Sequence, residues 1–337
     1  MPARLAVLIN AESRRNRRGA GRHLAAVADA DDVLLLERSA GQESAPLLAE
    51  ALAAGVRVLA VDGGDGTVMR VLTALADLAP VAHWPALALL PGGSSNVTAA
   101  DLGLPRRDVA TLRALRALAR GEEGNLTVVG APLLSVAGGG LRRPLRGFLW
   151  GAAGACDLVR EWERRCRRRG LVGHLSHLLM LARTAARLAL LGPEGTGLAA
   201  VRCRPALDGE DWGEGRRLLL VATTLRRLVL GARPWWNRDG RPLALTVVPA
   251  PPTAALRLLP RLLAGDDRPP PRLPGGWRSG GGHRATIAGL AEFVLDGELF
   301  AADPRTPLEI TGEETVRLVR PRSTVGASGF AARPGGR

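Results

Sequence analysis

In the first 124 residues, short apolar runs of strand length alternate with longer segments whose apolar residues recur at helical spacing. The predicted strands are 5–9, 33–36, 56–61 and 87–90, and the predicted helices are 14–29, 43–54, 67–79 and 107–120. Alternation of this kind is typical of a parallel sheet covered by helices. We therefore expect an α/β domain over residues 1–124.

After residue 125 the pattern changes to short apolar runs separated by glycine, proline and aspartate turns. These runs are 133–137, 198–204, 218–223, 243–248, 285–287 and 293–295. They predict a mainly antiparallel β domain over 125–299, interrupted by a helical pair at about 155–190. The segment 321–337 has little apolar content, which predicts a disordered tail.

The chain of 337 residues has a formal net charge of +14, which at first suggests a nucleic-acid-binding protein. However, it contains no lysine or tyrosine and is rich in alanine, glycine, proline, valine and arginine, as a GC-rich genome produces whatever the function. No basic motif interleaved with aromatic residues is present, so we expect no nucleic-acid partner. The absence of lysine also excludes a Walker-A lysine and Schiff-base catalysis. Phosphate must then be neutralised by backbone amides, arginine or metal.

Cysteine usage and hydropathy indicate the cellular setting. Cys156, Cys166 and Cys203 form no CxxC pair, so neither a disulfide framework nor a zinc site is predicted. The sequence enters its first predicted strand without a signal-peptide pattern. Its longest uncharged stretch, 78–100, is broken by prolines and a Gly-Gly pair, so no membrane-spanning helix is predicted. We expect a soluble cytoplasmic protein, with peripheral membrane contact left open.

A glycine-rich loop follows the third predicted strand and reads Gly63-Gly64-Asp65-Gly66-Thr67. In an open α/β sheet, ligands bind at the carboxyl ends of the strands. Glycines let backbone N–H groups approach an oligophosphate, the following helix N-terminus favours negative charge, and Thr67 adds a hydroxyl donor. Taken alone, this loop has a plain glycine turn as its alternative interpretation.

A second loop of the same kind follows the next predicted strand and reads Pro91-Gly92-Gly93-Ser94-Ser95-Asn96. Taken alone, it is also consistent with a Pro-Gly turn followed by a serine N-cap. Because the two loops follow successive strands, we expect them at one edge of the same sheet. Together they predict a phosphate cradle, in which Ser94 and Ser95 line the phosphates.

These loops resemble those of the diacylglycerol kinase catalytic-domain family, which includes bacterial lipid kinases and sphingosine kinases. The GGDGT loop is shared with NAD kinases, whereas the segment 91–105 is similar to the lipid-kinase motif PxGTxNxxAxxLGxP. Further similarity is found at Ile9-Asn10, 151–157, 169–171, 234–240 and Asp296-Gly297-Glu298. The resemblance therefore extends over about residues 4–320.

The resemblance implies a nucleotide-binding α/β domain of the NAD kinase and diacylglycerol kinase type, followed by a β-sandwich domain for the lipid substrate. Residues 300–320 are expected to return to the first domain. It further implies an ATP-dependent, Mg²⁺-using lipid kinase of phospholipid metabolism, which transfers the γ-phosphate to the hydroxyl of a diacylglycerol or sphingoid-like acceptor. An NAD kinase-like enzyme and a catalytically impaired lipid- or nucleotide-binding homologue stay open as alternatives, and so do the metal ligands and a homodimer.

Phosphoryl transfer to an alcohol requires a cradle for the leaving diphosphate, Mg²⁺, and a carboxylate that orients or deprotonates the hydroxyl. The sequence offers two candidates for this carboxylate, Asp65 in the glycine loop and Asp296. The resemblance implies that Asp296 is the general base, with Glu298 as its acidic neighbour and Asp65 as a further catalytic acid close to the nucleotide and metal. It also implies that Asn10 and Asn96 hydrogen-bond the nucleotide. A solvated hairpin turn is the alternative interpretation of Asp-Gly-Glu.

The chain departs from the family pattern beside both glycine loops. The polar residue and glutamate that usually follow the first loop are Met69 and Arg70 here, and Val97 and Thr98 replace the usual aspartate and Phe or Leu of the second motif. Arg70 reverses the local charge. It either neutralises phosphate in place of a lysine or indicates altered or lost nucleotide binding.

A third departure lies at 234–240, where some bacterial members carry paired acids that hold a structural Mg²⁺. This chain has Trp235, Trp236 and a single Asp239 in that segment. Because one carboxylate makes a poor Mg²⁺ site, we do not expect the metal there.

Residues 160–169 hold six arginines against two glutamates and precede an amphipathic helical pattern. Contact with anionic lipid headgroups and an ordinary solvated face are both consistent with this cluster. His174 and His177 share one face of the predicted helix, but without a third ligand they do not predict a metal site.

Overall fold

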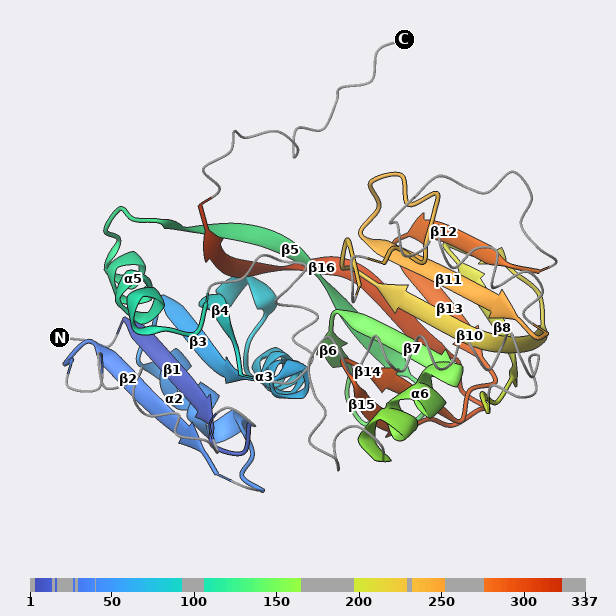
Figure 1. Ribbon diagram of the computed structural model, residues 1–337, viewed down its shortest axis with the longest axis horizontal. Coiled ribbons are helices and arrows are strands. Elements are labelled where there is room, and N and C mark those ends of the chain that lie inside the picture. The colour runs from blue at the N-terminus through green and yellow to red at the C-terminus, as the bar shows by residue number, and fades with distance from the viewer. Residues whose placement is uncertain are drawn as a thin grey trace, which may run out of the picture.

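The computed structural model describes residues 4–13, 16, 27, 30–39, 41–92, 106–164, 197–228, 232–251 and 276–322. Figure 1 shows two groups of strands along the long axis, joined by the long strands β5 (Leu126–Gly138) and β16 (Leu308–Pro321). The predicted helix 14–29, the second motif beyond Gly92 and the tail lie largely or wholly outside the described residues.

Four parallel strands form the N-terminal sheet in the order β4, β3, β1, β2. They are β1 (Leu5–Asn10), β2 (Val33–Arg38), β3 (Val58–Gly63) and β4 (Ala86–Pro91). Every residue of β1 and β3 is buried, because the sheet is covered on both faces.

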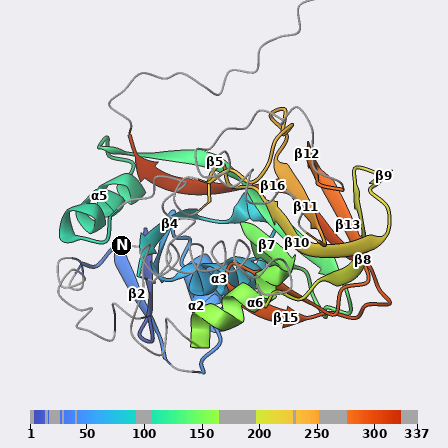
Figure 2. The same ribbon diagram turned by 45° about the vertical axis from the view of Figure 1, so that its right-hand side comes forward.

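Helices from different parts of the sequence cover the two faces (Figure 2). They are α2 (Ala45–Ala53) and α3 (Asp65–Leu78) on one face and α5 (Val109–Arg120) on the other, and a short 3-10 helix, η2 (Val81–His83), precedes β4. Side chains that alternate along a strand point to opposite faces of the sheet. Leu8 therefore packs in the same core as Leu72 of α3, whereas Leu5 packs in the core that contains Leu112 of α5.

The rest of the chain is mainly antiparallel. Its elements are β6 (Leu145–Gly147), β7 (Leu149–Ala153), α6 (Gly154–Trp162), β8 (Val201–Leu207), β9 (Glu210–Asp211), β10 (Gly215–Thr223), β11 (Leu243–Pro249), β12 (Arg278–Gly282), β13 (Arg284–Ala288), β14 (Glu292–Leu295) and β15 (Glu298–Ala301). A second core, which includes Trp150, Phe293 and Ile310, lies between these strands.

The strand β16 connects the two regions. Its N-terminal part pairs antiparallel with β13, its whole length pairs with β5, and Leu318 pairs in parallel with Leu87 of β4. Leu318 is fully buried in the core of the parallel sheet, whereas Ile310 lies in the second core. The strand β16 therefore completes a sheet that the first ninety residues begin.

The predicted fold class is confirmed: parallel strands with covering helices come first, and antiparallel strands follow. The glycine-rich strand β12 was missed because it lacks an apolar pattern. Its glycines permit close packing, since a Cβ at Gly281 would lie 2.1 Å from the carbonyl oxygen of Arg238. Of the predicted helical pair at 155–190, the described residues contain α6.

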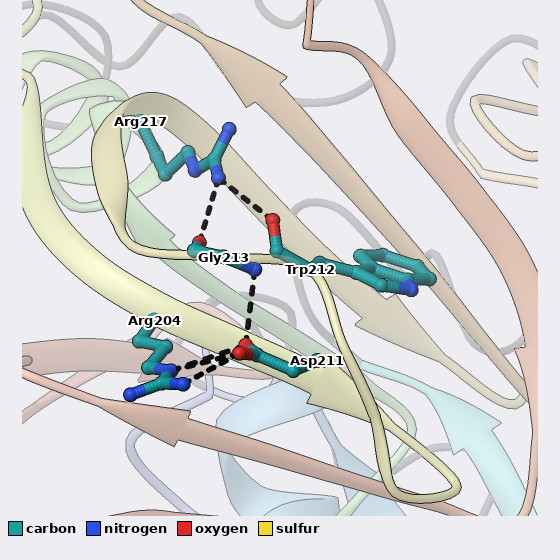
Figure 3. Close-up of polar contacts among 5 residues, drawn as sticks. All are labelled: Arg204, Asp211, Trp212, Gly213 and Arg217. Atoms are coloured by element: carbon teal, nitrogen blue, oxygen red, sulfur yellow. Dashed lines mark hydrogen bonds and ion pairs between the residues drawn. The ribbon is translucent and has the colours of Figure 1, made fainter.

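An internal arginine stabilises the turn between β9 and β10 (Figure 3). Arg217 is 8% exposed and donates to the carbonyl oxygens of Trp212 and Gly213, at 3.2 and 2.9 Å. On the neighbouring surface, Asp211 accepts hydrogen bonds from Arg204 and from the Gly213 N–H. Arg204 and Arg217, two of the many arginines of the chain, therefore have a structural role in this turn.

Within the described part of the chain, no helix combines the length and apolar character needed to cross a membrane.

Candidate functional site

The first glycine loop forms the junction between β3 and α3. Gly64 is the N-cap of α3 in extended conformation, and its carbonyl oxygen accepts from the N–H groups of Thr67 and Val68. Gly63 packs tightly on the first turn, since a Cβ there would lie 2.6 Å from the Thr67 Cβ. The loop therefore needs glycine at this position, and it turns the helix N-terminus toward the carboxyl edge of the sheet.

The start of the second loop lies directly against the first. Gly63 and Pro91 are paired across β3 and β4, and the Gly92 N–H donates to the Gly63 carbonyl oxygen at 2.9 Å. A Cβ at Gly92 would lie 3.1 Å from the Gly63 nitrogen. The expected adjacency of the two loops is therefore present as far as Gly92, and the other predicted residues of this loop, Gly93, Ser94, Ser95 and Asn96, lie outside the described residues.

Asn10 links the end of β1 to the glycine loop. Its buried side-chain amide donates to the Thr67 hydroxyl oxygen at 2.8 Å, and its Oδ1 accepts from the Glu12 N–H. Arg38, at the end of the neighbouring strand, also approaches Asn10 Oδ1, at 3.4 Å. The carboxyl ends of β1, β2 and β3 thus present one connected polar edge.

A buried ion pair beneath this edge was not predicted from the sequence. Asp62 is fully buried, and its Oδ1 accepts from Arg107 Nε at 2.8 Å. Arg107 also donates to Asn16, whose amide donates to the Asn10 carbonyl oxygen. Asp62 was visible in the sequence as an acid that ends an apolar strand, but its partner is 45 residues away and gave no local signal.

Asp296 lies in the two-residue turn between β14 and β15. Asp296 and Gly297 have φ angles of 47° and 86°, as a type I′ hairpin turn requires. The Asp296 Oδ1 accepts from the N–H groups of Phe148 and Leu149, at 3.1 and 2.9 Å. A turn is therefore present, but its carboxylate points inward and is buried instead of solvated.

The pKa of Asp296 is raised from 3.8 to about 8. Burial is the main cause, and the nearby negative charge of Asp65 adds to it, while the backbone N–H groups of Leu149 and Phe148 act in the opposite direction. A carboxyl with this pKa changes its protonation state near neutral pH, as proton transfer requires.

Glu298 brings the same hairpin onto the glycine loop. A Cβ at Gly66 would lie 2.2 Å from Glu298 Oε1, so the Glu298 side chain covers Gly66. Its other oxygen lies 3.0 Å from the Arg70 guanidinium. Asp65 therefore lies close to Asp296 and Glu298 at the N-terminus of α3, although this hairpin is far from Asp65 in the sequence.

Met69 and Arg70, the two residues beside the first glycine loop that differ from the family pattern, lie in different surroundings. Met69 is buried in the second core, so an apolar residue suits that position. Arg70 is about half exposed and forms the ion pair with Glu298. Val97 and Thr98 lie outside the described residues.

The residues present fit an Mg²⁺ ion that accompanies a nucleotide, because such ions are held by one or two carboxylates together with substrate phosphates. Asp65 supplies a carboxylate in the first turn of α3, within the first glycine loop. The 234–240 segment does not fit a structural Mg²⁺: Asp239 is exposed, and the nearby backbone carbonyls bind Arg238 instead. Across the described residues, no group of three or more His, Cys, Asp or Glu side chains is arranged to hold a metal.

Comparison with known proteins supports the resemblance drawn from the two glycine loops. Residues 4–131 match the family model of the diacylglycerol kinase catalytic domain. A 73-residue segment is 41% identical to the Chromohalobacter salexigens protein named Probable lipid kinase YegS-like. That match spans 22% of this chain and 23% of the relative's own length.

Solved structures support the fold of almost the whole chain. A Bacillus anthracis protein assigned as a diacylglycerol kinase has a TM-score of 0.61 and 17% identity, and the match covers 94% of this chain and 97% of that one. Yeast NADH kinase in complex with NADH has a TM-score of 0.51 and 8% identity, over 96% of this chain and 84% of that one. At these identities the superpositions establish the fold alone.

Proposed function

We propose that this chain, whose residues 4–131 belong to the diacylglycerol kinase catalytic-domain family, is a lipid kinase that transfers the γ-phosphate of ATP to a lipid hydroxyl. The family supports a kinase, and the finer statements on ATP, Mg²⁺ and the acceptor are our proposal. One observation carries it: the Asp296 hairpin reaches the glycine loop across the fold, so that Glu298 covers Gly66.

The nucleotide phosphates would lie on the backbone N–H groups of 63–67 and of the second loop, at the N-terminus of α3. The helix dipole and the N–H groups favour negative charge there, which compensates for the missing lysine. Asn10 is held against Thr67 and would orient the nucleotide at the end of β1. When bound, Mg²⁺ would spread the charge of the phosphates, with Asp65 as its protein ligand.

Asp296 would take the proton from the acceptor hydroxyl. The N–H groups of Phe148 and Leu149 fix its carboxylate, while burial and the charge of Asp65 raise its pKa to about 8. A base with this pKa is matched to a proton that becomes acidic only as the hydroxyl attacks phosphorus. Glu298, paired with Arg70 over Gly66, would keep the hairpin aligned with the glycine loop.

The acceptor would be a membrane lipid such as diacylglycerol or a sphingoid-like alcohol. The segment 91–105 resembles the lipid-kinase motif and argues against NAD as the acceptor. An NAD kinase-like activity is the second candidate, because the fold is also that of the yeast NADH kinase.

The decisive experiment is a labelled-ATP assay with diacylglycerol, a sphingoid base, an isoprenoid alcohol and NAD as separate acceptors. We expect label in the organic phase with one of the lipids, and loss of that label in Asp296→Asn. Label in a water-soluble product with NAD would assign the second candidate. ATP binding without transfer to any acceptor, unchanged by Asp296→Asn, would reject both and leave a binding protein.

A further inference from the structure

Arg238 lies at the centre of a ring of backbone carbonyl oxygens. Its Nε donates to the Arg241 carbonyl at 2.9 Å, and one terminal nitrogen donates to Thr224 at 2.8 Å and also to Pro242. The other terminal nitrogen donates to the Leu225 carbonyl. One guanidinium thus ties the end of β10 to the start of β11.

The loop that carries Arg238 is shaped to hold this cation. Asn237 and Asp239 have positive φ angles of 57° and 48°, and Gly240 follows at 75°. The Asn237 carbonyl accepts from the Gly281 N–H at 2.9 Å, so the loop rests on the glycine strand β12. The guanidinium also lies 5.9 Å from the ring centroid of Trp235, within cation–π range.

A ring of carbonyl oxygens is also the ligand set that hard divalent cations prefer. Here the cation is supplied by the chain. A second positive ion among the same oxygens would be repelled by the guanidinium, and the adjacent acid, Asp239, is exposed. This segment is therefore complete without a metal.

The carbonyls that Arg238 holds are connected to the candidate general base. The Thr224 N–H donates to the Phe148 carbonyl at 3.2 Å, and the Thr223 hydroxyl donates to the same oxygen at 2.7 Å. The N–H of that same residue, Phe148, donates to Asp296. A continuous hydrogen-bonded path therefore runs from Arg238 through 223–225 and Phe148 to the Asp296 carboxylate.

We propose that Arg238 is a built-in cation that replaces a structural divalent metal in this segment and positions Asp296 through Phe148. The positioning part rests on the proposed kinase function, whereas the metal-independent stability of the fold does not. Arg238 itself does not touch the substrate in this proposal.

The first part of the proposal, that the fold needs no structural metal, is tested by thermal unfolding. The Tm of the whole chain is measured without nucleotide, once in excess EDTA and once in millimolar MgCl₂. We expect the same Tm for the wild type in both. Arg238→Met should lower Tm by about 5 °C in both solutions, because several charge-assisted hydrogen bonds are lost. The matched control is Arg241→Met in the same loop, which removes only the exposed ion pair with Asp208 and should leave Tm nearly unchanged.

A wild-type Tm that falls in EDTA and recovers with MgCl₂ would overturn the first part, and so would equal Tm values for Arg238→Met and Arg241→Met. If Arg238→Met does not fold, Arg238→Lys supplies the comparison. Lysine keeps the charge but lacks the planar fork, so an intermediate Tm is expected.

The positioning part is tested by the pH dependence of kcat/KM. A loosened Phe148 N–H stabilises the Asp296 carboxylate less, so the rising limb of the profile should move to higher pH in Arg238→Lys, with kcat about tenfold lower and KM for ATP unchanged. The limb should not move in Arg241→Met. A lower Tm in Arg238→Lys with an unshifted limb would show that Arg238 stabilises the fold without positioning the base.

Discussion

The surroundings of Asp296 in the folded chain disfavour the ionised form of its carboxyl group. In the unfolded chain its pKa is near 3.8, whereas burial and the charge of Asp65 raise the folded value to about 8. Between these values the folded state holds a proton that the unfolded state has released. The contribution of Asp296 to the free energy of unfolding is therefore fully present below about pH 4. It decreases as the pH rises and is lost by about pH 8.

Replacing Asp296 with asparagine should separate stability from activity. The amide oxygen can still accept from Phe148 and Leu149, but the group no longer ionises. We expect Asp296→Asn to have a higher Tm than the wild type at about pH 8 and an equal Tm near pH 4, while phosphoryl transfer is lost. Calorimetry at both pH values measures the difference, and a lower Tm for the variant at alkaline pH would contradict this account.

The same pKa predicts how activity depends on pH. A base must be ionised to accept a proton, so kcat/KM should rise with pH along a limb centred near 8. In Asp65→Asn the neighbouring charge is gone, so the limb should move to lower pH even though the rate also falls. A limb that stays in place would indicate that Asp65 and Asp296 do not interact.

A substitution at Gly66 tests the contact between the β14–β15 hairpin and the first glycine loop. In Gly66→Ala the new Cβ would meet the Glu298 carboxylate at 2.2 Å, so Glu298 must leave the helix N-terminus. We expect turnover to fall about tenfold, because the displaced group is the end of a flexible side chain that aligns the hairpin and does not itself react. Gly124→Ala is the matched control, because a Cβ there meets nothing within 4 Å. Equal activity of the two variants would remove Glu298 from the site.

The site could be predicted from the sequence where its residues stand in short motifs. The loop 63–67, Asp296 and Glu298 were identifiable because glycine and acid spacings carry local meaning, and the structure brings them together. The support of Asp296 by Phe148 and the burial of Asp62 against Arg107 were not predictable. These contacts join segments 45 to 148 residues apart and leave no periodic signal.

At the scale of elements, α3 and the β14–β15 hairpin meet through Arg70 and Glu298. Both side chains are about half exposed, so the pair should contribute less than about 1 kcal/mol to stability. Its role would be to align the hairpin with the glycine loop, which gives Arg70 a structural function at this position.

Arg70→Glu should therefore reduce activity more than stability. Two like charges would push Glu298 off Gly66, and we expect turnover to fall about tenfold while Tm changes by no more than about 2 °C. The double variant Arg70→Glu with Glu298→Arg restores opposite charges, and should recover the Tm but not the turnover. Full activity in the single variant would show that the pair does not align the hairpin.

Elements were predictable where burial imposes a pattern. The strands β1, β3 and β4 are nearly continuous apolar runs because both faces of the parallel sheet are covered. The strand β12 was missed because Arg278–Gly282 consists mainly of small residues. Its glycines are explained by what packs on them, namely Leu207 and the backbone of Arg238, which sequence pattern cannot show.

At the scale of the whole molecule, β5 and β16 hold the two regions together. Pairing of Leu318 with Leu87 places the C-terminal part of β16 at the edge of β4, where both leucines are fully buried. The parallel sheet therefore depends on β16, which lies far from its other strands in the sequence. The family resemblance led us to expect that residues near the end of the chain return to the first domain. The apolar pattern of 308–321 alone predicts a strand but does not indicate which strand it pairs with.

A fragment of residues 1–124 should not fold cooperatively. Without β5 and β16 the edge of β4 and the core around Leu87 and Leu75 are exposed, which favours aggregation. We expect no sharp unfolding transition by circular dichroism and a large species by size exclusion. A chain that ends at Arg322 keeps β16 and serves as the control. Cooperative unfolding of the fragment would contradict the dependence on β16.

The Asp-Gly-Glu hairpin is held from two sides, with Asp296 fixed by amides next to β7 and Glu298 fixed by α3. In a molecule whose two regions had separated, neither carboxylate would lie beside the glycine loop. Under the proposed kinase function, such a molecule would lack its base and would leave ATP intact instead of transferring a phosphate to water. Under the same proposal, correct assembly of the two regions would also protect ATP from hydrolysis without transfer.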